Sequence, residues 1–269
     1  MVRRASVGPL AGAALNPLAD SHVHLHAYGD AEIAAMLDRA WEAGVGTVVA
    51  VSVDLASAGR TVGLRHARVR VVPAVGLHPA RLTGPVDDAA WAAVVEVARD
   101  RRVGAIGECG VDGDGPADAV VQLASLAHHA ALAASRDLPL LLHLRGSDGL
   151  IGRALAIVAD EGARGIVHYF VGGAELAERY LSAGLEIAVG KPVARGESVA
   201  LREAIAARIP LERLLLETDT YPLAGRTTEP ADVRLVAEAV ARLKGASVEE
   251  VARATRSNLE RLLGPARPA

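Results

Sequence analysis

Three histidines occupy alternate positions in the segment ADSHVHLH, residues 19–26. Successive side chains of a strand point to opposite faces, so Asp20, His22 and His24 would share one face. Two imidazoles on one face are compatible with a metal site, but a solvated polar strand explains the same pattern. If this segment binds a metal, the rest of the chain must supply further ligands.

Four other ionisable residues complete a candidate ligand set, namely Glu108, His143, His168 and Asp219. Four imidazoles and two carboxylates suit borderline divalent cations, and a shared carboxylate reduces the repulsion between two ions. Without cations, desolvated carboxylates would be costly. Two ions about 3.5–4 Å apart bind a water molecule and the substrate oxygens together, and they lower the pKa of that water. The set therefore predicts a hydrolase with two divalent ions, for which Zn, Mn, Mg and Ni are candidates.

The elements that must position these residues follow from eight short segments rich in Val, Ile and Leu. They are residues 18–24, 47–52, 70–76, 103–108, 138–143, 165–168, 185–189 and 213–219. Between them, Ala-rich segments carry apolar residues at i, i+3, i+4 and i+7, which is typical of amphipathic helices. Buried strands alternating with helices indicate a parallel sheet. Eight such units predict a single-domain α/β fold, the (β/α)8 TIM barrel, with a doubly wound open sheet as the alternative.

The six candidate ligands all fall at the carboxyl ends of these segments. His22 and His24 end the first, Glu108 the fourth, His143 the fifth, His168 the sixth and Asp219 the eighth. In a parallel barrel those ends converge on one mouth, where barrel enzymes keep their catalytic residues. Each residue alone has a structural explanation, but six at one face favour a single site.

Composition limits the class of protein. The chain has 269 residues, of which 51% are hydrophobic, and a formal net charge of −3, which predicts a soluble globular protein. A pI near 6.3 excludes an overall positive field that would attract polyanions, although a local cleft can still bind one. The single cysteine, Cys109, excludes an internal disulfide framework and is expected to be buried and unreactive.

The domain is expected to span residues 18–264, preceded by a flexible N-terminal tail over residues 1–17. No segment reaches the roughly 18 consecutive apolar residues of a membrane span, so we expect a cytoplasmic protein with no membrane partner. The sequence leaves the oligomeric state open.

Several motifs resemble those of the TatD family of metal-dependent deoxyribonucleases, within the amidohydrolase superfamily. In order they are DSHVHL (20–25), GLHP (76–79), IGECGVD (106–112), LPLLLHLR (138–145), VHYFVGG (167–173), LLLETDTYPL (214–223), TEP (228–230) and SNLERLLG (257–264). They follow the family's order over nearly the whole chain. The resemblance implies that His22 and His24 hold one metal, that Glu108 bridges, and that His143 and His168 hold the second. It also implies that Asp219 binds the first metal and orients or deprotonates the attacking water.

The resemblance implies substrate contacts as well. His78 would contact a substrate phosphate or support a ligand, and Arg145 would clamp a phosphate unless it is a salt-bridged rim residue. Tyr169 and Tyr221, together with Tyr28, lie within four residues of an expected ligand, and one base or sugar could stack there. Asp20 is expected to support a ligand imidazole.

Departures from the family pattern concern the substrate side. Gly113 and Asp114 replace two aromatic residues, Ala80 replaces a histidine, and Thr228 replaces an asparagine. We therefore expect a phosphodiesterase or phosphohydrolase whose substrate is DNA or a phosphorylated small molecule. An ester or amide hydrolase, including a deacylase of aminoacyl-tRNA, is the alternative. A non-catalytic metal-binding protein is a third hypothesis.

Overall fold

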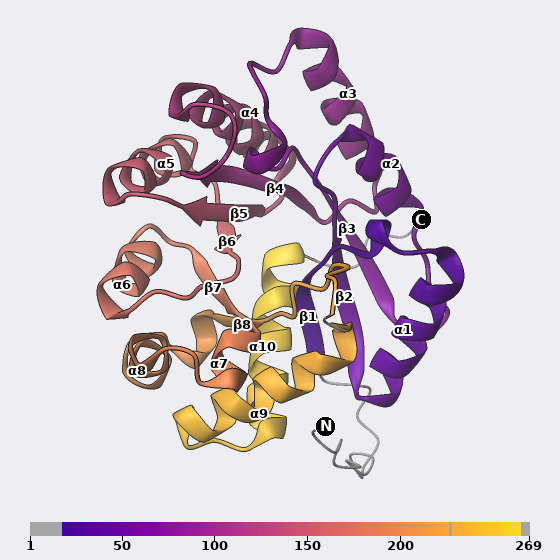
Figure 1. Ribbon diagram of the computed structural model, residues 1–269, viewed down its shortest axis with the longest axis vertical. Coiled ribbons are helices and arrows are strands. Elements are labelled where there is room, and N and C mark those ends of the chain that lie inside the picture. Colours follow the sequence, from indigo (N-terminus) through magenta and orange to yellow (C-terminus); the bar gives the residue numbers. More distant parts are fainter. Residues whose placement is uncertain (1–17, 226–227, 265–269) are drawn as a thin grey trace.

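Eight parallel strands form a nearly closed barrel in the computed structural model, which describes residues 18–225 and 228–264 (Figure 1). The strands are β1 (Leu18–Val23), β2 (Val45–Val51), β3 (Arg70–Val75), β4 (Ala105–Asp112), β5 (Leu140–Arg145), β6 (Gly165–Val167), β7 (Glu186–Val189) and β8 (Leu214–Leu216). Each pairs with the next along the chain, so the (β/α)8 TIM barrel is confirmed and the open doubly wound sheet is excluded. The N-terminal segment predicted as a tail, residues 1–17, lies outside the described residues.

Helices connect the strands on the outside of the barrel (Figure 1). The α-helices are α1 (Asp30–Glu42), α2 (Leu55–Gly63), α3 (Asp88–Ala98), α4 (Ala119–Arg136), α5 (Asp148–Asp160), α6 (Ala174–Ser182), α7 (Lys191–Arg195), α8 (Val199–Ala207), α9 (Val233–Lys244) and α10 (Val248–Leu263). Four short 3-10 helices are η1 (Leu25–Ala27), η2 (Pro79–Arg81), η3 (Leu211–Arg213) and η4 (Pro230–Asp232). None of the helices in the described parts of the chain is long and apolar enough to cross a membrane.

The barrel interior is filled by small and branched side chains from alternate strand positions, as the fold requires. Val49, Leu141, Ile166 and Leu215 belong to one buried cluster, which Leu262 of α10 joins. The opposite strand faces pack against the helices in a second, larger cluster. Both faces of each strand are therefore buried, which explains the nearly continuous apolar segments in the sequence.

The predicted ends of three strands were wrong by more than one residue: β8 stops at Leu216, before Asp219, and two strands run past their predicted ends. β4 runs on to Asp112 and β5 to Arg145, so Glu108 and His143 lie inside strands instead of ending them. The β4–β5 register shifts between Gly107 and Cys109, which leaves Glu108 as an extra, unpaired residue. A bulge of this kind redirects a side chain within an otherwise regular strand. It brings the Glu108 carboxyl group to the mouth even though the strand continues beyond it.

One buried histidine ties a helix to the loop after β3. The Leu77 N–H donates to Nε2 of His129, 3.0 Å away, and His129 Nδ1 donates to the Ser125 carbonyl oxygen at 2.7 Å. Burial lowers the pKa of His129 to about 4, from 6.5. The neutral ring is required because a protonated Nε2 could not accept the Leu77 hydrogen bond.

This arrangement predicts a pH-dependent effect of His129→Gln. Between pH 6.5 and 4 the unfolded chain binds a proton at His129 that the folded protein does not, so His129 lowers the free energy of unfolding by up to about 3 kcal/mol as the pH falls. Glutamine keeps an acceptor without this titration. Urea unfolding of the metal-free proteins should therefore show a lower free energy of unfolding for the variant than for the wild type at pH 7.5. This difference should disappear by pH 5. An exposed neighbour, His128, provides the control His128→Gln. A difference in the free energy of unfolding that does not change with pH would contradict the neutral state assigned to His129.

Candidate active site

The six predicted ligands meet at the carboxyl ends of the strands, around the carboxylate of Glu108. They come from β1 and its end, from β4 and β5, and from the residues that follow β6 and β8. Glu108 is buried, with 1% of its surface exposed. Its two oxygens face different groups of side chains, so the carboxylate divides the site into two clusters that share it.

The first cluster lies at Oε2 of Glu108. His22 Nε2 is 3.2 Å and His24 Nε2 is 3.6 Å from this oxygen, and His24 Nε2 is 3.4 Å from Oδ1 of Asp219. Asp219 has a left-handed backbone conformation (φ 51°), which aspartate tolerates better than most residues. Its N–H donates to the His22 carbonyl oxygen at 3.1 Å, so the backbone fixes its carboxylate next to the histidines of β1.

The second cluster lies at Oε1 of Glu108. His143 Nδ1 is 2.9 Å and His168 Nε2 is 2.8 Å from this oxygen, and these two nitrogens are 3.1 Å apart. His78 Nε2 also lies 3.1 Å from Oε1. The loop that carries His78 comes this close because a Cβ at Gly76 would lie 2.6 Å from the Gly107 Cα, so only glycine fits there.

The tautomers of two imidazoles follow from their outer nitrogens. His24 Nδ1 lies 3.2 Å from the Val51 carbonyl oxygen, and His143 Nε2 lies 3.0 Å from Oδ2 of Asp112. Both outer nitrogens face acceptors and therefore carry the proton. When these imidazoles are neutral, their inner nitrogens turn lone pairs toward the carboxylate oxygens of Glu108 and Asp219.

Imidazole lone pairs and carboxylate oxygens repel each other at these distances unless a positive charge lies between them. Glu108 Oε2 is also buried without a hydrogen bond of acceptable geometry. Imidazole nitrogens and carboxylate oxygens are the ligands of borderline divalent ions. Three groups of donor atoms lie close enough together to hold a metal ion: His22, His24 and Asp219; His78, Glu108 and His143; and His22, His168 and Glu217. The donor set therefore fits divalent cations at both clusters.

The charges of the site agree with this fit. Burial raises the pKa of Glu108, but the imidazoles of His168, His22 and His78 hold it well below its usual value. Burial likewise opposes ionisation of Asp219, yet a hydrogen bond from His24 when its Nε2 is protonated, together with positive charge on the neighbouring imidazoles, lowers the pKa of Asp219 to about 2. Burial lowers the pKa of His22 to about 4. The carboxylates of the site are thus ionised where positive charge faces them, whether from protons on the imidazoles or from bound cations.

A cleft of about 520 Å³ opens above the two clusters. His78, Arg145 and Tyr221 line it together with His26, which donates to the Val51 carbonyl oxygen at 2.9 Å. Tyr221 packs edge-on against His24, with ring centroids 6.2 Å apart. Three of the four predicted substrate contacts therefore lie in the cleft.

Tyr169, the fourth predicted substrate contact, lies beside the cleft. It lines an adjoining cavity of about 400 Å³, and the Arg145 guanidinium lies over its ring at 5.5 Å. Among the described residues Arg145 forms no ion pair with a carboxylate. Its guanidinium packs on the Tyr169 ring, where the cleft and the adjoining cavity meet. The rim salt bridge considered from the sequence is replaced by this cation–π contact.

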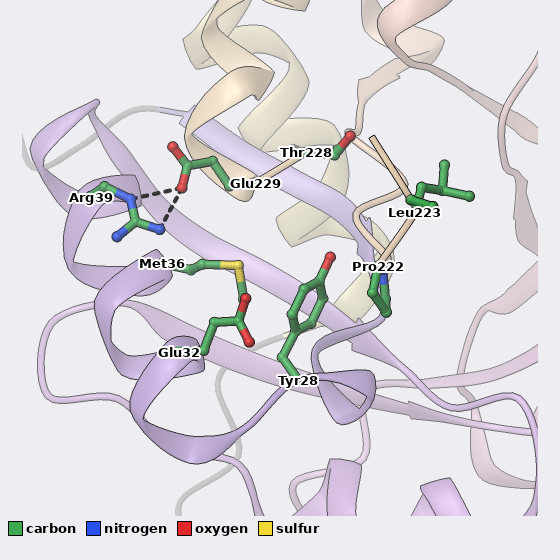
Figure 2. A pocket seen from close by; sticks show the side chains of 9 residues that line it. Tyr28, Glu32, Met36, Arg39, Pro222, Leu223, Thr228 and Glu229 are labelled. Atoms are coloured by element: carbon green, nitrogen blue, oxygen red, sulfur yellow. Dashed lines mark hydrogen bonds and ion pairs between the residues drawn. The ribbon is translucent and has the colours of Figure 1, made fainter. Parts of the chain in front are cut away.

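Tyr28 and Thr228 also lie away from the cleft. They line a separate pocket of about 420 Å³ between α1 and the segment after β8 (Figure 2). There, Arg39 of α1 pairs with Glu229, with Nε and Oε2 2.7 Å apart. The chain turns through η1 directly after His24, and this turn carries Tyr28 outward. Tyr28 therefore lines a pocket of its own and not the cleft above the two clusters.

Asp20 was also assigned the wrong partner. Its Oδ1 accepts from the backbone N–H groups of His22 and Thr218, and its Oδ2 accepts from the Thr218 hydroxyl at 2.6 Å. It therefore fixes the backbone of β1 against the segment after β8 and does not contact an imidazole nitrogen. Burial raises its pKa to about 7. Cys109 is fully buried, as predicted.

Two carboxylates of the site were missed in the sequence. Asp112 at the end of β4 contacts His143, as described above, and its backbone N–H donates to Gln122 of α4 at 2.6 Å. Glu217 accepts the Tyr169 N–H at 2.5 Å and is completely buried. Glu217 could have been found from the sequence by its position two residues before Asp219, directly after β8.

Comparisons with known proteins agree with this architecture. The model of the family described as TatD related DNase matches residues 19–264. The uncharacterized metal-dependent hydrolase TatD of Mycobacterium tuberculosis is 35% identical, over 92% of this chain and 98% of that protein. The 3'-5' ssDNA/RNA exonuclease TatD of Dickeya dadantii is 31% identical, over 71% of this chain and 75% of that protein.

Among solved structures, the TatD homologue YJJV of Escherichia coli superimposes with a TM-score of 0.80 at 27% identity. The match covers 93% of this chain and 98% of that one. The family model spans nearly all of the described barrel, including all six residues gathered around Glu108. The chain therefore belongs to the TatD family of metal-dependent hydrolases.

Proposed function

We propose that this protein is a two-metal hydrolase that cleaves phosphodiester bonds in DNA or in a phosphorylated small molecule. The observation that carries the proposal is the Glu108 carboxylate, whose two oxygens each face a separate donor cluster. His22, His24 and Asp219 would hold one divalent ion, His143 and His168 the other, and Glu108 would be shared. Bound there, the ions would supply a water of lowered pKa and positive charge for the substrate oxygens.

Asp219 has the properties of the residue that orients and deprotonates the attacking water. It is ionised, since its pKa lies at about 2, and 13% of its side chain is exposed at the cleft. Its Oδ1 faces His24, which leaves the other oxygen available to accept a proton from a water in the cleft. General base assistance of this kind typically contributes 10²–10⁴-fold to the rate.

His78 and Arg145 supply the contacts for the charged part of the substrate. The Ala80 N–H donates to His78 Nδ1 at 3.0 Å, so the neutral ring carries its proton on Nε2, at the cleft side. With its proton on Nε2, which lies 3.1 Å from Oε1 of Glu108, His78 has no lone pair there for a metal ion and would donate to that carboxylate or to a phosphate oxygen. Arg145 adds a planar guanidinium at the cleft wall, suited to two phosphate oxygens. Relatives named ssDNA/RNA exonucleases support nucleic acid as a substrate.

A substrate panel tests the proposal. The protein is freed of metal with a chelator, reloaded with Mn²⁺, Mg²⁺, Zn²⁺ or Ni²⁺, and assayed with bis-p-nitrophenyl phosphate, p-nitrophenyl phosphate, p-nitrophenyl acetate, an amino-acid anilide and end-labelled single-stranded DNA. We expect metal-dependent cleavage of the phosphodiester and of the DNA, at rates at least tenfold above those with the ester and the anilide. Faster turnover of the ester or anilide would favour the acyl hydrolase instead. Metal-independent turnover would contradict both.

A further inference from the structure

The outer nitrogens of the four candidate ligand imidazoles are not equally supported. Those of His24 and His143 face the Val51 carbonyl and the Asp112 carboxylate, as described above. The outer nitrogens of His22 and His168, both Nδ1, are buried and have no hydrogen-bond partner. A buried polar atom left unpaired costs about 1–3 kcal/mol, so these two require an explanation.

Glu217 lies where these two nitrogens converge. The rings of His22 and His168 stack with centroids 4.1 Å apart at 21°. His168 Nδ1 is 3.7 Å from Oε1 of Glu217, and the two histidines and Glu217 each offer one ligand atom within 4.8 Å of the others. The second oxygen, Oε2, is itself buried and unpaired. His22, His168 and Glu217, each with a buried polar atom that lacks a hydrogen bond, therefore lie together beside the candidate metal centre.

The backbone fixes Glu217 in this place. Its N–H donates to the Val189 carbonyl oxygen of β7 at 3.1 Å, and its Oε1 accepts the Tyr169 N–H at 2.5 Å. Glu108 and Glu217 therefore approach the two imidazoles from opposite sides, since Nε2 of both rings lies close to Glu108. One carboxyl group faces the inner nitrogens and the other faces the outer nitrogens.

We propose that Glu217 is a positioning residue shared by both metal subsites. The Nδ1–H groups of His22 and His168 are directed at its carboxyl group, which fixes both rings with their Nε2 lone pairs toward Glu108. This inference rests on the proposed two-metal function, because His22 belongs to one subsite and His168 to the other. Partners of this kind typically contribute 10–100-fold to metal affinity. Asp112, by contrast, supports His143 alone and so serves one subsite.

The variant Glu217→Gln tests the shared role. Glutamine has nearly the same size and can still accept the Tyr169 N–H, but its NH₂ group opposes the two Nδ1–H groups. We expect the dissociation constants of both ions to rise about 10–100-fold. They are measured by titrating the metal-free protein with Zn²⁺ in competition with a chromophoric chelator, so catalysis does not enter the readout.

Two matched variants separate positioning from general destabilisation. Asp112→Asn should weaken one ion only. Glu186→Gln removes a carboxylate that is also buried, at the start of β7, where it binds Arg213 and Arg261. It should lower stability and leave both dissociation constants unchanged. Equal weakening by Glu186→Gln would mean that Glu217 acts through stability, and the inference would fail.

A measurement on the unaltered protein covers the case in which Glu217→Gln does not fold. Long-range ¹H–¹⁵N spectra of the zinc-loaded protein report which nitrogen of each histidine carries the proton. We expect Nδ1–H for both His22 and His168. An Nε2–H tautomer at either one, or weakening of a single ion in Glu217→Gln, would overturn the inference. Wild-type protein that binds fewer than two ions would instead refute the proposed function.

Discussion

Replacing Asp219 with asparagine is expected to leave the barrel folded and to lower kcat at least about 10³-fold with a phosphodiester substrate. Asparagine keeps the size of the side chain, and the backbone N–H at position 219 still donates to the His22 carbonyl oxygen. It removes the negative charge and the ability to accept a proton from water. KM should change little, because the substrate contacts proposed for His78 and Arg145 do not involve Asp219.

The measurement is steady-state kinetics on protein loaded with saturating Mn²⁺, with metal content and thermal unfolding recorded on the same samples. Asp160→Asn is the control, because Asp160 is an exposed aspartate at the last position of α5, in the outer layer of helices. It should turn over substrate at the wild-type rate. Turnover by the Asp219 variant within tenfold of wild type would remove Asp219 from the proposed mechanism.

The second large effect is expected for Glu108→Gln, on metal content. An amide has one oxygen and one NH₂ group, so it can offer an oxygen to only one of the two clusters. Its NH₂ group would face the imidazole nitrogens of the other cluster. The charge that offsets the repulsion between two ions is also lost. We expect about two ions per chain in the wild-type protein and fewer than one in the variant.

Elemental analysis after dialysis against limiting Zn²⁺ provides the ion count. Glu186→Gln again serves as the matched control, since it makes the same chemical change at a buried glutamate remote from the mouth, and it should retain two ions. Loss of a single ion in Glu108→Gln, with the other bound at unchanged affinity, would argue against a shared carboxylate. It would favour a role for Glu108 in one cluster only.

Much of the fold was predictable because its strands are buried on both faces and its helices carry one apolar stripe. Those two periodicities mark all eight strands, including strands as short as β6 and β8, and the amphipathic helices predicted between them. The extent of β4 was not predictable, because a bulge changes register without changing the apolar pattern. For the same reason, Glu108 was predicted to end its strand, although it lies within β4.

The six residues of the candidate metal centre were predictable because the carboxyl ends of parallel strands must converge. What surrounds them depends on side-chain geometry at closer range. Asp112 was missed because the strand was expected to end at Glu108. Asp20 was placed on the correct face but given the wrong partner, since its contact with Thr218 depends on how β1 and β8 are aligned. Such contacts between distant segments leave no periodic signal.

The place where the barrel closes has a consequence for biosynthesis. The chain returns to its starting strand only after β8, where Asp219 and Thr220 bond to the backbone of His22 and His24. The first donor cluster therefore joins the beginning of the barrel to a residue some two hundred positions later. A nascent chain still lacking its last fifth can gather Glu108, His143 and His168, but it has no complete partner for the N-terminal histidines. Under the proposed ligand assignment, full metal loading must wait until the ribosome has released enough chain for the first and last strands to meet.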